Sequence, residues 1–312
     1  MKKRVLSLML LALSIIMCIC MVSCGGEEEK DTTTTTTAKP NGGGDGTGTH
    51  THSFVDGVCS GCGASIPTTQ GLKYTLASDQ SGYFVSLGDC ADKEIYIPST
   101  YEGKPVLYIA EDGFRESSIT KVVVPSSVLF VGPKAFYDCA SLESVELPDA
   151  MNSIERNAFY RCDNLKTVKM PQSLENGLGE AAFYKCASLE SIVIPSGVTS
   201  LGEYTFQGCA KLKSVEFLSE ITVIGESAFQ GCSSLEAIDL SESLEKIESS
   251  AFLGCSSLTS IVIPVGVTSV GNYAFSGCTN LTIKCEAESE PAAWWPQWNN
   301  SGCSVEWGFK AE

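Results

Sequence analysis

Two histidines and two cysteines lie close together in the stretch HTHSFVDGVCSGCGA, near the start of the chain. His50, His52, Cys59 and Cys62 offer two imidazoles and two thiolates, a ligand set that suits tetrahedral zinc. The Cys-x-x-Cys half is common in zinc knuckles, and the glycine after Cys62 permits a tight turn. The loop is very short, however, and a local disulfide or free thiols would fit the same residues. We predict a small knuckle over residues 49–66, with structural zinc as the one candidate cofactor.

Catalytic chemistry finds little support elsewhere in the chain. The sequence holds two histidines in all, so a Ser-His or Cys-His pair cannot be assembled beyond the knuckle. A redox-active Cys-x-x-Cys needs a thioredoxin-like βαβ surround, which the sequence lacks. We therefore predict that the protein is not an enzyme and has no catalytic residue.

Seven other cysteines recur at one register, each three residues after a phenylalanine. They are Cys139, Cys162, Cys186, Cys209, Cys232, Cys255 and Cys278. A buried cysteine behaves as a small hydrophobe, so we expect a packed column of thiols. The side chains of neighbouring cysteines in such a column would point in the same direction, which is poor geometry for a disulfide between them. Cys285 and Cys303 lie outside this row and are the candidates for one disulfide.

The phenylalanines mark a repeat of about 23 residues. They are Phe114, Phe136, Phe159, Phe183, Phe206, Phe229, Phe252 and Phe275. Each cysteine is followed three residues later by leucine, then by alternating aliphatic residues such as Ile192 and Ile194, and usually by proline. Alternating β-branched residues predict a short strand, which proline ends. One such coil cannot close a core alone, so the coils must stack as a solenoid.

A period of 23 with L-x-x-L-x-L at its centre is typical of leucine-rich repeats. The fuller pattern I-x-I-P-x-x-V-T-x-I-G-x-x-A-F-x-G-C resembles the BspA-like (Treponema pallidum-type) subfamily, over about residues 71–312. The resemblance implies a right-handed superhelix with a parallel β-sheet on its concave face and turns or short helical turns on its convex face. It also implies a bacterial surface protein connected with adhesion or protein binding, with no shared catalytic residue.

Both ends of the stack need covering. Residues 71–112 resemble the N-terminal start of such arrays, and residues 113–284 carry the repeats. After Ile283 the repeat dissolves, and residues 285–312 hold all four tryptophans of the chain. We interpret this segment as a C-terminal cap, and sugar stacking on exposed tryptophan is the alternative.

The first residues are typical of an export signal. Three basic residues precede an almost wholly apolar run, Val5 to Val22, and Cys24 ends a stretch that resembles the lipobox of bacterial lipoproteins. We predict a signal peptide over residues 1–23, lipidation of Cys24 and a flexible tether over residues 24–48. A plain secretory signal or an uncleaved membrane anchor is the alternative.

Charge limits the partners. The chain has 21 Lys and Arg against 37 Asp and Glu, a formal charge of −16, which repels nucleic acid. Two surface rows are candidates for ligand binding. One is the outward strand row Val123, Glu146, Lys169, Val193, Glu216, Asp239 and Val262, and the other is Tyr137, Tyr160 and Tyr184. The valines also fit an ordinary scattered surface, and the tyrosines fit half-buried packing at the edge of the coils.

Together these patterns predict a monomeric, lipid-anchored protein at the bacterial cell surface. Its solenoid would bind a protein or glycan partner, and it would meet the membrane through its N-terminal lipid. A carbohydrate-binding protein or enzyme with its site in the Trp-rich end and a structural component of the cell envelope are the alternatives.

Overall fold

The computed structural model describes residues 54–55, 58–59 and 68–310. The predicted signal peptide, Cys24 and the tether lie outside these residues, as do His50, His52 and Cys62 of the knuckle. Between them, β1 (Phe54–Val55) and β2 (Val58–Cys59) form a short antiparallel hairpin. Within the described part of the chain, no helix has the length and apolar character needed to span a membrane.

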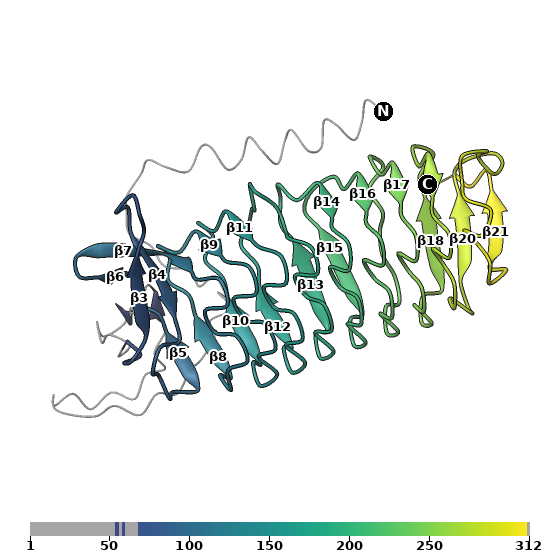
Figure 1. Ribbon diagram of the computed structural model, residues 1–312. Helices are drawn as coiled ribbons and strands as arrows, with labels where there is room; N and C mark the ends of the chain where they lie inside the picture. The colour runs from purple at the N-terminus through teal and green to yellow at the C-terminus, as the bar shows by residue number, and fades with distance from the viewer. Residues whose placement is uncertain (1–53, 56–57, 60–67, 311–312) are drawn as a thin grey trace, which may run out of the picture. The chain divides into compact units, whose positions relative to one another are not determined.

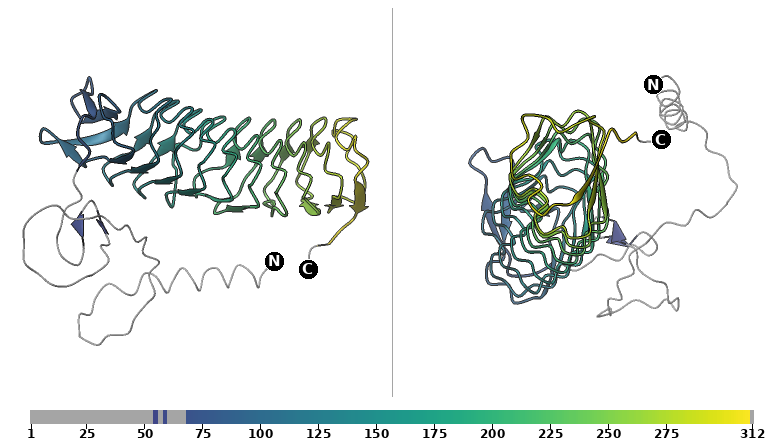
Figure 2. Two further views of the ribbon diagram at one scale, coloured as in Figure 1. Left: turned by 90° about the horizontal axis from the view of Figure 1, so that it is seen from below. Right: turned by 90° about the vertical axis from the view of Figure 1, so that its right-hand side faces the viewer.

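Residues 68–310 wind into a β-solenoid of about ten turns, and the described residues include no helix (Figure 1). Seen end-on in Figure 2, the coils lie one behind another. We call one turn of the solenoid a coil. This architecture confirms the predicted repeat solenoid with parallel strands.

The predicted strands form a first parallel ladder, which is interrupted twice, and the coil that contains Asp239 has no strand in it. Its three parts are β5 (Glu94–Tyr96), β8 (Lys121–Val123), β10 (Ser144–Glu146) and β12 (Thr167–Lys169); β13 (Ser191–Ile194) and β15 (Ser214–Phe217); and β18 (Ser260–Ile263), β20 (Thr282–Cys285) and β21 (Ser304–Trp307). Within each part, equivalent residues of successive coils pair directly.

A second parallel ladder, which the sequence analysis did not predict, runs along another side of the coils. It is built from the segment that corresponds to V-T-x-I-G in most of the repeats, and the repeat that contains Leu178 adds only an isolated bridge. Its short strands are β9 (Phe130–Val131), β11 (Ser153–Ile154), β14 (Ser200–Leu201), β16 (Val223–Ile224), β17 (Lys246–Ile247) and β19 (Ser269–Val270). Most coils therefore have two places at which hydrogen bonds can tie them to their neighbours.

The N-terminal end is covered by antiparallel strands. β3 (Lys73–Leu76) pairs with β4 (Tyr83–Ser86), and β6 (Thr100–Tyr101) pairs with β7 (Lys104–Ile109). β4 and β7 then run parallel and lead into the second ladder through β9. These antiparallel strands cover the edge of the parallel stack, so that no further coil is needed to pair with it.

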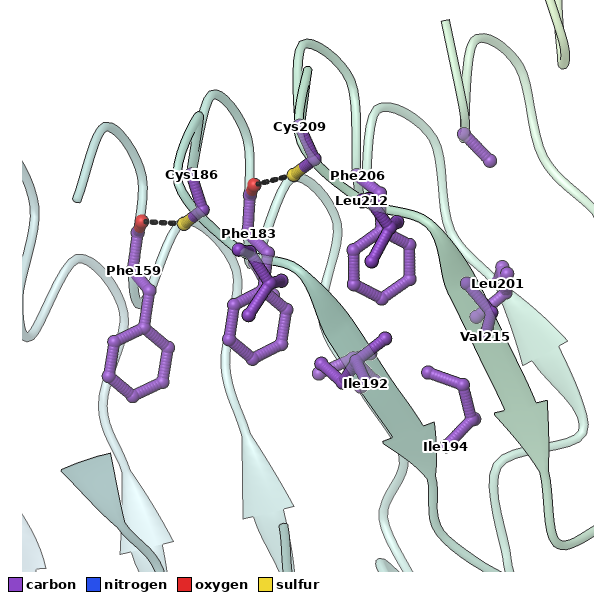
Figure 3. Packing of buried hydrophobic residues seen from close by; sticks show 14 of the residues in the cluster. Phe159, Phe183, Cys186, Ile192, Ile194, Leu201, Phe206, Cys209, Leu212 and Val215 are labelled. Carbon is purple, nitrogen blue, oxygen red and sulfur yellow. Dashed lines mark hydrogen bonds between the residues drawn. The ribbon is translucent and has the colours of Figure 1, made fainter. Parts of the chain in front are cut away.

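The core is a column of phenylalanine rings, as the repeat predicts. All eight repeat phenylalanines are fully buried, and successive ring centroids lie 5.1–5.6 Å apart in near-parallel planes. Figure 3 shows three of these rings beside the aliphatic residues of the strands. Stacking lets each coil shield the apolar face of the next.

The repeat does not dissolve after Ile283; it continues for one more coil. Trp298 follows Phe275 by 23 residues and closes the column edge-on, with ring centroids 6.2 Å apart. β21 pairs in register with β20. Trp294 and Trp298 are buried, whereas Trp295 is 54% exposed. This buried plug favours the cap interpretation over a tryptophan-lined sugar groove.

Candidate binding surfaces

The outward strand row is brought together by the register of the first ladder. Val123, Glu146 and Lys169 follow one another on β8, β10 and β12. Val193 pairs with Glu216 across β13 and β15. Because parallel strands pair without slippage within each part of the ladder, residues a coil apart in sequence lie side by side there.

The row is longer than predicted. At its start Tyr96 pairs with Val123, and at its end Val262 pairs with Lys284, which pairs with Glu306. The sequence patterns did not predict Tyr96, Lys284 and Glu306 as members of the row, because the first and last coils depart from the repeat pattern. The signal that could have identified them is that each directly follows an inward aliphatic residue of its strand. Asp239 is exposed, but it lies in a coil without an assigned strand.

Exposure along the row is uneven. Val193 is 38% exposed, and its paired neighbour Glu216 is exposed too. Val123 and Val262 are half-buried. An exposed β-branched residue between charged neighbours can contribute apolar contact area while the charges select the partner.

Charge pairing beside the row is sparse. On the neighbouring outward position, Lys166 contacts Glu143 at 2.9 Å, and both side chains are largely exposed. In the part of the chain that the structure describes, the other members of that alternating position, Glu190, Lys213 and Glu236, form no ion pair. Their charges are therefore free to meet a partner.

The three tyrosines form a stack on the turn side of the coils. Ring centroids of Tyr137 and Tyr160 lie 4.6 Å apart, and those of Tyr160 and Tyr184 lie 4.4 Å apart. All three are half-buried. Arg115 lies over the ring of Tyr137 at 4.8 Å, and Lys185 lies 5.5 Å from the ring centre of Tyr184. The stack is thus packed within itself, with one cation at each end.

The thiol column has a structural role in every coil. Each repeat cysteine donates its S–H to the carbonyl oxygen of the phenylalanine one coil earlier, at 2.8–3.2 Å (Figure 3). Burial raises the pKa of Cys209 to about 12 and that of Cys186 well above its usual value. A thiol held protonated in this way is neither a nucleophile nor a metal ligand.

The candidate disulfide in the C-terminal cap is wrong. Cys285 is buried as a free thiol in β20, and Cys303 is free as well. The Sγ atom of Cys303 instead lies 3.4 Å from the carbonyl oxygen of Cys278 and 3.9 Å from that of Phe275. Cys303 therefore ends the thiol column. Among the described residues, no group of three or more His, Cys, Asp and Glu is placed to hold a metal ion.

Comparisons with known proteins agree with this architecture. The family model for the BspA type leucine rich repeat region matches residues 107–177 and 176–288, in six copies. No curated protein matches the chain. Among solved structures, a leucine-rich repeat protein of T. pallidum (TpLRR) is 30% identical, with a TM-score of 0.57; the match covers 62% of this chain and 90% of that one.

Two further structures come from other bacteria. A leucine-rich repeat protein of Bacteroides ovatus is 26% identical, with a TM-score of 0.63, over 78% of this chain and 71% of that one. A leucine rich cell surface protein of Faecalibacterium prausnitzii is 29% identical, with a TM-score of 0.53, over 72% of this chain and 56% of that one. The family match covers more than half of the chain, and the chain belongs to the BspA-type leucine-rich repeat family.

Proposed function

We propose that this protein is a lipid-anchored, non-catalytic module at the bacterial cell surface that binds a protein partner through the outward strand row. Lipidation of Cys24 would hold the chain at the membrane, and the tether and knuckle would place the solenoid outward, with zinc bound by His50, His52, Cys59 and Cys62. The similar F. prausnitzii structure is described as a cell surface protein, which supports this location.

The observation that carries the proposal is the fixed register of the row within each part of the first ladder. Pairing places Val193 beside Glu216, and Val262 beside Lys284, so an apolar side chain lies next to a charged one in both parts. A partner that lies along the row meets a repeated spacing of contacts, which is how solenoids build extended interfaces. The absence of a histidine from residues 53–312 supports a binding role over hydrolysis.

The tyrosine stack is a second candidate surface. Its rings are already packed against one another. Arg115 at one end is already paired with Asp112 and Glu116, so Lys185 at the other end is the cation that this surface would offer to a partner. The strand row, in contrast, suits a partner with mixed apolar and polar contacts.

A pair of variants tests the strand row. The full-length protein, with Val193→Glu and Val262→Glu combined, is measured for binding to a panel of immobilised extracellular-matrix proteins. We expect at least a tenfold loss of affinity, because two apolar contacts with the partner would be replaced by charged groups. Val265→Glu is the matched control, since Val265 is 71% exposed in a turn outside the row. Equal binding by the double variant and the parent would reject the strand row as the interface.

A further inference from the structure

One coil of the solenoid is longer than its neighbours. Phe159 and Phe183 are 24 residues apart, and the extra residue falls in the segment Glu175–Asn176–Gly177. Leu174 and Leu178 are four residues apart there, whereas the equivalent Val198 and Leu201 of the next coil are three apart. Gly177 takes a left-handed conformation, with φ of 82°, which lets the chain bulge at this point.

The insertion interrupts the second ladder. Leu178 still bridges to Ile154 in the preceding coil, and Gly179 donates to the carbonyl of Ile154 at 2.8 Å. On its other side, however, the described residues show no backbone hydrogen bond between the segment 176–178 and β14. The N–H groups of Leu178, Thr199 and Gly202 have no partner within residues 68–310.

The next coils show what is missing. There Thr222 donates to the carbonyl of Thr199 at 2.8 Å, and Gly225 donates to the carbonyl of Leu201 at 3.0 Å. The corresponding bonds from Thr199 to Asn176 and from Gly202 to Leu178 are absent among the described residues. The carbonyl groups of Asn176 and Leu178, which would accept them, accept no backbone N–H from residues 68–310.

The two coils are also farther apart here. A Cβ placed on Gly202 would lie 3.3 Å from the nearest atom of the preceding coil, whereas the equivalent distances at Gly179, Gly225 and Gly271 are 2.3–2.7 Å. The opening has a volume of about 310 Å³. It is lined by Glu175, Asn176, Gly177, Leu178, Gly197, Val198, Thr199 and Ser200. We call this opening the ladder gap.

The ladder gap is a local feature, because the coils stay joined elsewhere. Ala181 donates to the carbonyl of Glu203 at 2.9 Å, and Phe183 donates to that of Thr205 at 3.0 Å. The rings of Phe183 and Phe206 remain stacked at 5.6 Å. The backbone around the gap is thus held in place while its donors and acceptors are left open.

This arrangement matches one ligand chemistry. Unpaired N–H groups, unpaired carbonyls, the amide of Asn176 and the hydroxyls of Thr199 and Ser200 line one small opening. A sugar hydroxyl both donates and accepts, so adjacent hydroxyls can satisfy such a mixed lining. The volume lies at the lower end of the roughly 300–1,000 Å³ typical of small-molecule sites. Glu175 and the net charge of −16 disfavour an anionic ligand.

We propose that the ladder gap binds a neutral sugar residue, through hydrogen bonds from its hydroxyls to the open backbone groups and to Thr199 and Ser200. An added peptide strand fits less well, because β14 is only two residues long and offers little edge for pairing. The site is separate from the strand row and does not depend on the function proposed for that row.

The test uses the full-length protein and saturation-transfer NMR with glucose, galactose, mannose, N-acetylglucosamine and, as an anionic probe, N-acetylneuraminic acid. One variant deletes Asn176, which restores the 23-residue spacing and should close the ladder. A second, Thr199→Val, keeps the shape of the side chain and removes its hydroxyl. Thr268→Val is the matched control, because Thr268 occupies the equivalent exposed position in a coil with an intact ladder.

We expect transfer to at least one neutral sugar and none to N-acetylneuraminic acid. Affinity for that sugar should fall by about fivefold to tenfold in Thr199→Val, the loss expected for one hydrogen bond, and stay unchanged in Thr268→Val. Hydrogen exchange at Thr199 and Gly202 should slow when Asn176 is deleted, and binding should vanish.

The proposal is overturned by transfer to none of the neutral sugars, by binding that survives closure of the ladder, or by stronger binding of the anionic sugar. If the deletion variant fails to fold, Thr199→Val and Thr268→Val decide: equal affinities in the two would overturn the site.

Discussion

The thiol of Cys209 donates a hydrogen bond of 3.1 Å to the carbonyl oxygen of Phe183, one coil earlier. The same carbonyl accepts the N–H of Cys186, within its own coil, at 3.2 Å. Both lone pairs of a buried carbonyl are thus filled by two successive cysteines of the column. This explains why the repeat carries cysteine rather than alanine or valine, because a hydrocarbon side chain would leave one of these sites empty.

Replacement of this thiol should therefore cost stability in a graded way. Cys209→Ala removes the donor and leaves a small void, and we expect a loss of about 1–3 kcal/mol in the free energy of unfolding. Cys209→Ser keeps a donor and should cost less than alanine. Urea denaturation of the three proteins measures the order. If serine costs as much as alanine or more, the S–H bond is not the reason for the cysteine.

Alkaline pH should weaken the solenoid well before lysine titrates. Burial raises the pKa of Cys209 to about 12, and burial together with neighbouring thiols raises the pKa of Cys186 and Cys232 well above the usual value. In the unfolded chain a thiol ionises near pH 8.5. The unfolded state therefore loses protons first, so the stabilisation is complete below about pH 8.5 and is lost as pH rises towards the folded pKa.

Each such thiol should contribute a slope of about 1.4 kcal/mol per pH unit over that window. Urea midpoints measured between pH 7.5 and 10 should fall steadily above about pH 8.5. A variant with both Cys186→Ala and Cys209→Ala should show a shallower decline than the parent. A midpoint that stays constant to pH 10, or the same slope in both proteins, would contradict this account.

The C-terminal coil supplies a matched pair of tryptophans. Trp298 is buried against Phe275, and its indole N–H donates to Glu290 at 3.1 Å, whereas Trp295 is mostly exposed. Trp298→Ala should lower the free energy of unfolding by about 3–5 kcal/mol, and Trp295→Ala should change it by less than about 0.5 kcal/mol. Thermal denaturation followed by circular dichroism distinguishes the two. Comparable losses would mean that Trp298 does not close the phenylalanine column.

The turn after each phenylalanine needs a left-handed residue two places on. Lys185 occupies that place with φ of 55°, and Gly231 occupies it two coils later with φ of 75°. Lys185→Gly should therefore raise the free energy of unfolding by about 0.5–1 kcal/mol, because glycine adopts this conformation without strain.

Gly231→Ala is the reciprocal change and should lower stability by about 1 kcal/mol. A Cβ on Gly231 would lie 3.7 Å from its nearest neighbour, so the cost is conformational and not steric. Chemical denaturation of both variants checks the opposite signs. A loss in Lys185→Gly would show that the contact between Lys185 and the Tyr184 ring outweighs the backbone strain.

The stacked architecture could be predicted because its signals are local and repeated. The positions of Phe206, Phe229 and Phe252 in one column follow from a constant spacing, and the strand at Ile192 and Ile194 follows from alternation bounded by proline. The outward row follows in turn, since fixed register places Val193 beside Glu216.

Other features of the fold could not be predicted, because their sequence signals are short or because they depend on the conformation of the backbone. The strand Ser200–Leu201 is too short to alternate. The final coil was hidden because Trp298 stands where the other coils have phenylalanine and because Cys303 is displaced from the repeat register. The 24-residue spacing before Phe183 was visible, but only the backbone decides whether an extra residue is absorbed in a turn or opens the ladder.

The free thiols of the described coils have a mechanical consequence. Ten cysteines are unlinked there, so no disulfide ties one described coil to the next. A tensile load along the chain would be resisted at each interface between these coils only by packing and hydrogen bonds. Every coil that unfolds would lengthen the chain by about 75–80 Å. Under force the solenoid should therefore extend in nearly equal steps. The coils that meet at the ladder gap should separate among the first, because they share fewer hydrogen bonds.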